Sequence, residues 1–100
     1  MSGEFPDFLA HVAGDHVAVA VHDVEPGPAR VGFLDESPAQ EITVSEAVPL
    51  GHKVALADVA DGADVIEYGL RIGIASQAIT TGGYVHTHNL RSARWQNSVA

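Results

Sequence analysis

Two short segments carry the residue types that could do chemistry, and the first is Gly51-His52-Lys53, which follows Pro49. A glycine before His-Lys lets the backbone turn tightly, so a cation and an imidazole are presented at the mouth of a strand. Lys53 could hold a carboxylate as a point charge, and His52 could transfer a proton or bind a metal. The alternative is a polar loop that faces solvent.

The second segment is Tyr84–Leu90, which contains His86, His88 and Asn89. If the segment is extended, side-chain alternation sends His86 and His88 to the same face. Two imidazoles on one face match half of a first-row metal site, which a carboxylate or a water would complete. The alternative is a strand at the surface whose histidines have no function.

Weaker candidates lie elsewhere in the chain. Asp15-His16 could add a ligand, although a turn at the entry of a strand explains both residues without function. Tyr68 and Arg71 could contact an acid, although such residues often rim small β domains. His11 and His22 are expected to be exposed bystanders. Spacing alone therefore predicts a possible histidine-lined site for an anion or a metal.

Short apolar strands must position these residues. The segment from Val17 to Val21 alternates valine and alanine, which predicts a strand. Residues 25–32 contain Pro26, Gly27 and Pro28, which predict a turn or loop. Gly73 suggests a bulge or a close backbone approach. Further short strands are predicted around 42–44, 54–57 and 65–68, residues 70–80 alternate again, and a turn at Gly82-Gly83 leads into the segment 84–90. Glycine or proline interrupts the chain every ten or so residues, which indicates an all-β domain.

Length and composition fit one small domain of 100 residues, of which 46% are hydrophobic and 18% are charged. The net charge of −8 disfavours nucleic acid and anionic membrane surfaces as partners. The chain has no cysteine, so any metal must be held by nitrogen and oxygen ligands. With no secretory segment or apolar run of membrane-spanning length, a cytoplasmic protein is expected. Free strand edges make a homo-oligomer possible.

Several motifs in the correct order resemble the N-terminal domain of the altronate and galactarate dehydratase family. The segments that carry the resemblance are 17–21, 48–56 ("VPLGHKVAL"), 65–75 ("VIEYGLRIGIA") and 79–89 ("ITTGGYVHTHN"). The resemblance covers roughly residues 15–94. The predicted organisation is therefore a loose N-terminal arm over 1–14, a domain over 15–94 and a C-terminal tail over 95–100.

The resemblance implies an all-β, SAF-type β-clip fold and membership of a lyase system that acts on hydroxylated carboxylic acids. In this family the small domain precedes a large catalytic domain or stands alone as a small subunit, as in the sulfolactate sulfo-lyase alpha subunit. A partner is thus implied, namely a large catalytic lyase subunit. A divalent metal, iron by expectation, would stabilise the developing enolate and the leaving group.

Site roles follow from that resemblance as predictions. His52 and Lys53 are the expected catalytic residues. Lys53, Asn89, Tyr68 and Arg71 are the expected contacts to a small acidic substrate, and His86, His88 and His16 the expected metal ligands.

Two positions depart from the family pattern. Glu67 stands where lysine is common, and His16 stands where asparagine is common. The loss of a cation at Glu67 favours an alternative function. In this alternative the chain is a non-catalytic, stand-alone binding module for a small acid or a protein partner.

Overall fold

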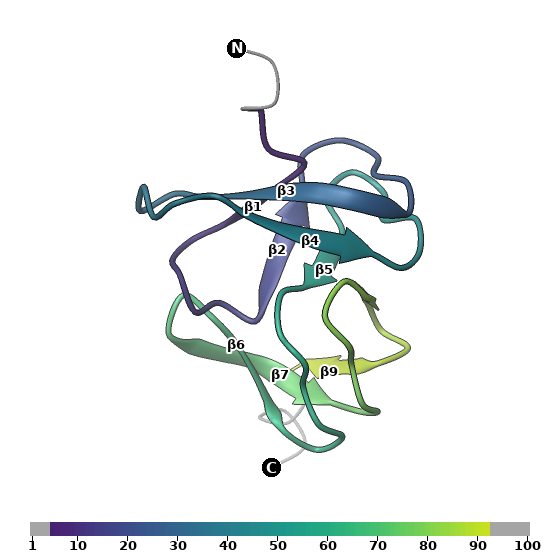
Figure 1. The fold of residues 1–100 in the computed structure, drawn as a ribbon. Coiled ribbons are helices and arrows are strands. Elements are labelled where there is room, and N and C mark those ends of the chain that lie inside the picture. Colours follow the sequence, from purple (N-terminus) through teal and green to yellow (C-terminus); the bar gives the residue numbers. More distant parts are fainter. Residues whose placement is uncertain (1–4, 93–100) are drawn as a thin grey trace.

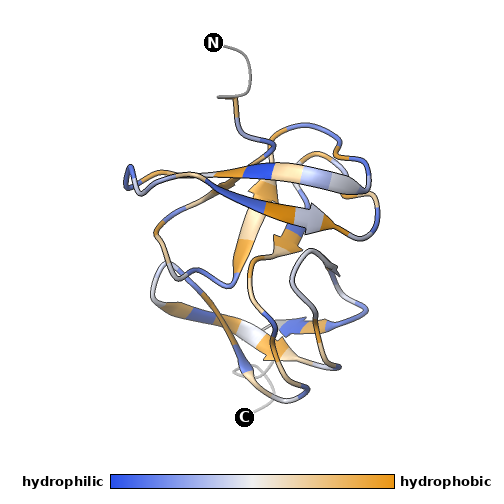
Figure 2. Ribbon diagram, in the orientation of Figure 1, coloured by the Kyte–Doolittle hydropathy of each residue, from blue (hydrophilic) through white to orange (hydrophobic). Residues whose placement is uncertain are grey.

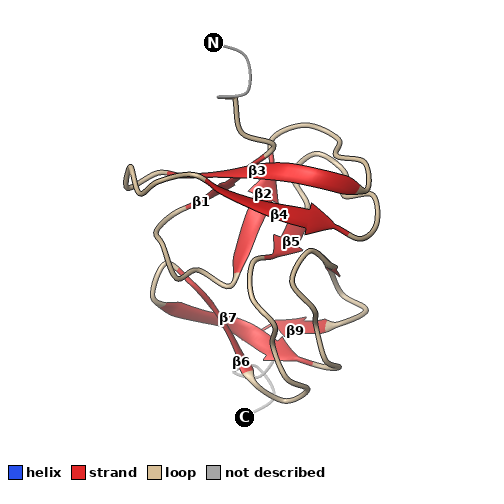
Figure 3. Ribbon diagram, in the orientation of Figure 1, coloured by secondary structure: helices blue, strands red, loops and turns tan. Residues whose placement is uncertain are grey.

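The structure is a computed structural model that describes residues 5–92, and in this range it contains strands but no helix (Figure 3). The all-β class predicted from the sequence is confirmed. No helix that could cross a membrane is therefore present in residues 5–92. The strands are β1 (Phe8–Ala10), β2 (Val17–Ala20), β3 (Gly27–Phe33), β4 (Gln40–Val44), β5 (Lys53–Ala55), β6 (Asp64–Glu67), β7 (Leu70–Ala75), β8 (Tyr84–Val85) and β9 (Leu90–Ser92).

Six strands form one sheet in the order β4-β3-β1-β2-β5-β8, and three form a second sheet in the order β6-β7-β9 (Figure 1). Within the first sheet β1 and β3 are parallel, and the other neighbours are antiparallel. Two isolated bridges, Val24 to Val48 and Val59 to Ile79, tie the connecting loops together.

The prediction of a loose arm over residues 1–14 is wrong for the segment that forms β1. Phe8 is fully buried, and β1 lies between β2 and β3 inside the larger sheet. The burial of one aromatic side chain stabilises by roughly 2 kcal/mol, which fixes a segment that has no recognisable period of its own. Residues 1–4 and the predicted tail, 95–100, lie outside the described residues.

The prediction of a turn or loop across residues 25–32 is also wrong, because β3 begins at Gly27 and contains Pro28. The proline is tolerated because it lies at the start of the strand. Pro28 pairs with Thr43 of β4, whereas β1 pairs with β3 only from Val31 onward. The missing N–H therefore falls where β3 has one strand neighbour.

The hairpin of β6 and β7 turns through Tyr68 and Gly69, whose φ angles are 55° and 74°. Positive φ at both central residues is what a two-residue type I′ turn requires. The β6–β7 register shifts between Val65 and Ile66, opposite Gly73. A Cβ on Gly73 would lie 2.4 Å from the carbonyl oxygen of Arg91, so the predicted close backbone approach is confirmed.

Two buried clusters form the core, and strands β2 and β5 contribute to both. Figure 2 shows hydrophobic residues along these two strands. Ala18 and Val54 point into the larger cluster, whereas Val17 and Ala55 point into the smaller one. Because side chains alternate along a strand, a strand covered on both faces needs apolar residues at successive positions. The valine-alanine sequence of β2 satisfies this need, and the two strands connect the two parts of the core.

Candidate functional site

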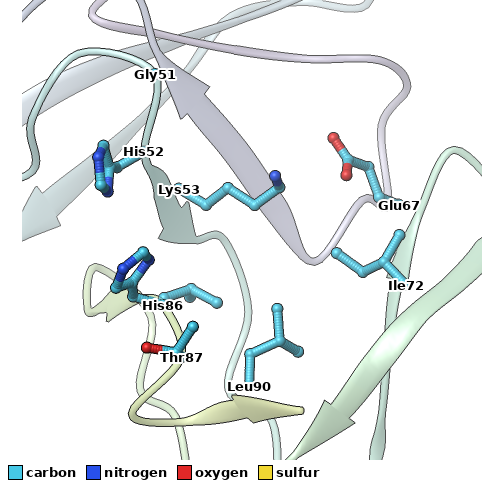
Figure 4. A pocket seen from close by; sticks show the side chains of 9 residues that line it. Gly51, His52, Lys53, Glu67, Ile72, His86, Thr87 and Leu90 are labelled. Carbon is cyan, nitrogen blue, oxygen red and sulfur yellow. The ribbon is translucent and has the colours of Figure 1, made fainter. Parts of the chain in front are cut away.

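A pocket of about 400 Å³ opens where the start of β5, the β6–β7 hairpin and the segment after β8 meet (Figure 4). Its walls combine one cation, one carboxylate, two imidazoles and a hydroxyl with aliphatic side chains. The lining residues are Gly51, His52, Lys53, Glu67, Ile72, Val85, His86, Thr87 and Leu90. Both predicted motifs therefore contribute to one pocket.

A tight turn presents His52 and Lys53 at this pocket. The His52 amide donates to the carbonyl of Pro49 at 3.0 Å, and Gly51 has a φ of 83°. This conformation is costly for residues that carry a Cβ. The turn is held to β2 because the Gly51 amide donates to the Ala20 carbonyl and the Ala20 amide donates to the His52 carbonyl, both at 2.8 Å.

Strand pairing brings the second motif to the first. Lys53 pairs with Val85, and Val54 pairs with Tyr84, in the antiparallel β5–β8 ladder. The same register, extended by one residue, places His52 opposite His86. Their ring centroids lie 5.1 Å apart.

His86 and His88 do not lie on an extended strand, because β8 ends at Val85 and a turn follows. Asn89 closes that turn. Its side-chain oxygen accepts from the His86 amide at 2.9 Å, and its Nδ2 donates to the Tyr84 carbonyl at 2.8 Å. Asn89 is only 6% exposed, so the structure gives it a role in shaping the turn. Its contact with a substrate stays a prediction.

Tyr84 is the site residue that the motif analysis missed. Its hydroxyl lies 2.6 Å from Nδ1 of His52, and its ring stacks on His86 with 5.5 Å between centroids and 6° between planes. The His88 ring also packs on Tyr84, with 5.8 Å between the ring centroids. Strand alternation could have found Tyr84, because it stands two residues before His86.

Glu67 forms the opposite wall of the pocket. Figure 4 shows Lys53 and Glu67 extending toward each other across it. Lys53 makes no ion pair with a described carboxylate, whereas Glu67 lies 3.6 Å from Nε2 of His11. The Glu67 side chain is 15% exposed. The pocket thus contains a cation at one side and an anion at the other.

Five predicted site residues do not line this pocket. Besides His88 and Asn89, they are His16, Tyr68 and Arg71, which have partners elsewhere. Nδ1 of His16 accepts from the Ile66 amide at 3.0 Å, which ties β2 to β6. The Tyr68 ring packs on His11 at 5.0 Å. Nη1 of Arg71 lies 3.7 Å from Asp64.

The predicted metal ligands do not converge into a complete site. Within residues 5–92 no three histidine or carboxylate side chains lie close enough together to hold one ion. Nδ1 of His16 accepts a backbone hydrogen bond, so that nitrogen has no lone pair left for a metal. The side chains of residues 5–92 therefore do not by themselves form a site for a divalent cation.

The resolved pKa shifts belong to groups outside the pocket. The carbonyl of Asp23, followed by the carboxylate of Asp7, raises the pKa of His22, whose ring nitrogens lie 2.7 and 2.8 Å from these oxygens. Hydrogen bonds from the Thr81 amide and hydroxyl lower the pKa of Asp58. Hydrogen bonds from Ser37 lower the pKa of Asp35. These groups contribute to folding rather than to the pocket.

The sequence of the chain is similar to a known domain family and to several known proteins. A sequence profile of the altronate/galactarate dehydratase SAF domain matches residues 6–93. The chain is 40% identical over 91 residues to the (2R)-sulfolactate sulfo-lyase subunit alpha of Chromohalobacter salexigens. The aligned region covers 89% of this chain and 97% of that protein. The chain is 43% identical over 54 residues to the subunit of the same name from Paracoccus pantotrophus, covering 54% of this chain and 81% of that one.

A second kind of relative is much longer. The altronate dehydratase of Escherichia coli is 45% identical over 78 residues, which is 78% of this chain but 15% of that enzyme. From the profile match and the near full-length relative together, it follows that the chain belongs to the altronate/galactarate dehydratase SAF domain family.

Proposed function

We propose that this chain is the small subunit of a lyase that acts on a hydroxylated carboxylic acid together with a separate large catalytic subunit. One observation carries the proposal: the fold gathers His52, Lys53 and His86 at a single pocket. This occurs in a chain that is similar over nearly the full length of a relative named as a sulfo-lyase subunit alpha.

The pocket walls suit such an acid. The Lys53 ammonium provides a point charge for a carboxylate, and Thr87 provides a hydroxyl for a polar substituent. Ile72, Val85 and Leu90 provide an apolar surface for the carbon skeleton. A ligand with one anionic end and a short hydroxylated chain satisfies these groups.

The proposed reaction is an elimination. A base removes the proton α to the carboxylate, the C–H electron pair forms a C=C bond, and the leaving group departs from the β-carbon with its bonding electrons. Negative charge develops on the carboxylate during the first step. His52 and Lys53 would stabilise that charge, which is how preoriented donors and cations accelerate such reactions. The leaving group would be sulfite, or a hydroxyl that takes up the proton held by the base and departs as water.

We assign the remaining chemistry to the large subunit. The pocket is open, and closing a site against water strengthens every electrostatic interaction inside it. The iron expected from the family resemblance stays a prediction. Any such ion would need ligands beyond the side chains of residues 5–92, and no step described above passes through it.

A stand-alone binding module is the second candidate, and Glu67 favours it. A carboxylate in the pocket wall repels an acid that carries a second negative charge, which would limit catalysis on such substrates. In this case the chain would bind a small acid or a protein partner without turnover.

The test is isolation of the tagged chain from its own cells under anoxic conditions, with mass spectrometry, metal analysis and lyase assays of the complex. We expect a stoichiometric large subunit and activity on a sugar acid or sulfolactate. Lys53 is the only lysine of the chain, so Lys53→Gln removes its one ammonium side chain. We expect this change to lower kcat/KM about tenfold to a hundredfold, as removal of a charged contact does.

Arg71→Gln is the matched control, because it removes a cation that does not line the pocket. Its activity should stay near that of the unmodified complex. A chain that purifies without a partner and without activity would contradict the lyase proposal and support the binding module.

A further inference from the structure

The contact between Tyr84 and His52 bears on how His52 acts. The two atoms, the hydroxyl oxygen and Nδ1, lie 2.6 Å apart and join strands that are separated by 32 residues in sequence. Among residues 5–92 the Tyr84 hydroxyl has no other hydrogen-bond partner. Within the described structure, Nδ1 of His52 is therefore the hydrogen-bond partner of this hydroxyl.

Chemistry decides which atom donates. In a neutral imidazole one nitrogen carries a proton and the other is an acceptor. A phenol is a stronger acid than a neutral imidazole N–H, and an imidazole nitrogen is a stronger base than a phenol oxygen. The arrangement in which the Tyr84 hydroxyl donates to Nδ1 is therefore favoured. The proton of the neutral His52 ring then resides on Nε2.

We propose that Tyr84 is a positioning residue that holds His52 in the Nε2–H tautomer, so that the second ring nitrogen of His52 is a hydrogen-bond donor. The stacking of Tyr84 on His86, with 6° between the ring planes, keeps the tyrosine ring in place for this role. In many histidine sites, a hydrogen bond to one ring nitrogen determines in this way whether the other ring nitrogen carries a proton.

The consequence concerns the ligand. In the Nε2–H tautomer His52 offers an N–H to an oxyanion, and it has no free lone pair to accept a proton or to bind a metal. It would therefore donate to an oxygen of the acid rather than take up a proton from it. This reading of the ligand rests on the proposed function, whereas the tautomer itself does not.

The test is ¹⁵N NMR of the full chain with labelled histidine, at about pH 8, where an unperturbed imidazole is neutral. Long-range ¹H–¹⁵N couplings report which ring nitrogen of His52 carries the proton. We expect the Nε2–H form in the unmodified chain. Tyr84→Phe keeps the stacked ring but removes the hydroxyl, and it should shift the tautomer ratio toward Nδ1–H by roughly twofold to tenfold.

Tyr68→Phe is the matched control. Tyr68 is 62% exposed and its ring packs on His11, so the His52 signals should not change. An Nδ1–H form in the unmodified chain would overturn the proposal, and so would an unchanged ratio in Tyr84→Phe. The measurement on the unmodified chain can refute the proposal even if the variant does not fold.

The outcome is separable from that of the proposed function. The tautomer is measured without a ligand or a partner subunit. An absent lyase partner would therefore leave this inference intact, and the wrong tautomer would leave the lyase proposal intact.

Discussion

Substitution of the buried Asp15 by alanine should destabilise the fold severely, although this residue lies outside the pocket. Asp15 is 4% exposed, and its carboxylate accepts three backbone hydrogen bonds. Oδ2 accepts from the amides of His11 at 2.9 Å and Val12 at 3.3 Å, and Oδ1 accepts from the amide of Tyr68 at 2.8 Å. One side chain therefore ties the loop after β1 to the hairpin that carries Glu67.

The magnitude follows from these three contacts. A hydrogen bond to a charged group contributes about 1.5–3 kcal/mol, and the 3.3 Å contact contributes less than the other two. Loss of two strong bonds and one weak bond should lower the free energy of unfolding by about 3–5 kcal/mol. A domain of this size has about 5–15 kcal/mol in total. Asp15→Asn keeps one accepting oxygen, so it should cost about half as much.

Urea unfolding followed by far-UV circular dichroism measures this loss, with linear extrapolation and a check that the m value is unchanged. Asp61→Ala is the control, because Asp61 is exposed and its carboxylate accepts no hydrogen bond from a described residue. Its effect should stay within about 0.5 kcal/mol. If Asp15→Ala costs no more than Asp61→Ala, the role assigned to the three hydrogen bonds is refuted.

Three further predictions concern backbone approach, pH and specificity. Gly82→Ala should cost more than about 4 kcal/mol in urea unfolding, because its Cβ would lie 1.9 Å from a backbone carbonyl oxygen. Gly62→Ala has a similar φ of 86° but open space around its Cβ, so it should cost only about 1–2 kcal/mol; equal losses would contradict the steric reasoning. The raised pKa of His22 means that its hydrogen bonds stabilise the fold fully below about pH 6.5 and that this stabilisation is lost as the pH rises through the folded-state pKa. The destabilisation by His22→Gln should therefore be larger at about pH 5.5 than at about pH 8, and the opposite order would contradict the sign. Glu67→Gln should tighten the binding of a dianionic acid relative to a monoanionic one by about threefold to tenfold in calorimetry of the assembled complex, whereas an unchanged ratio would place Glu67 too far from the ligand to matter.

The fold could be predicted where the sequence has a clear period of two. Alternation located β2, β6 and β7, and the glycine at position 73 indicated the close approach that the structure contains. It could not locate β1, which is three residues long and has no period. The position of β1 depends on its parallel pairing with β3, more than 20 residues away. Such long-range pairing is set by burial rather than by local pattern.

Proline misled the prediction for β3. Pro28 removes one donor, and a local rule counts that as the end of a strand. The loss has little effect here because Ala29 and Val31 still point into the core and the rest of the ladder to β4 is intact. Burial of two apolar side chains outweighs one absent hydrogen bond.

The residue types of the site could be predicted, but their grouping could not. Both motifs line the pocket, as expected of residues that act together. His16, by contrast, is held by a backbone amide of β6, a contact that no motif indicates. The predicted pairing of His86 with His88 assumed an extended strand. A turn closed by Asn89 replaces that strand, and Tyr84 lies between the imidazoles instead.

Register explains why the two motifs belong together although more than 30 residues separate them. In the β5–β8 ladder, Lys53 faces Val85, and the next position outward brings His52 against His86. A slip by one residue would reverse the face of every β8 side chain and would separate the two rings. A turn on each strand at this end of the ladder opposes such a slip: the Gly51 turn is bonded to β2, and the Asn89 turn is bonded to the Tyr84 carbonyl. The glycine and the asparagine of the two motifs therefore fix the register, and the register in turn places the imidazoles and the lysine at one pocket.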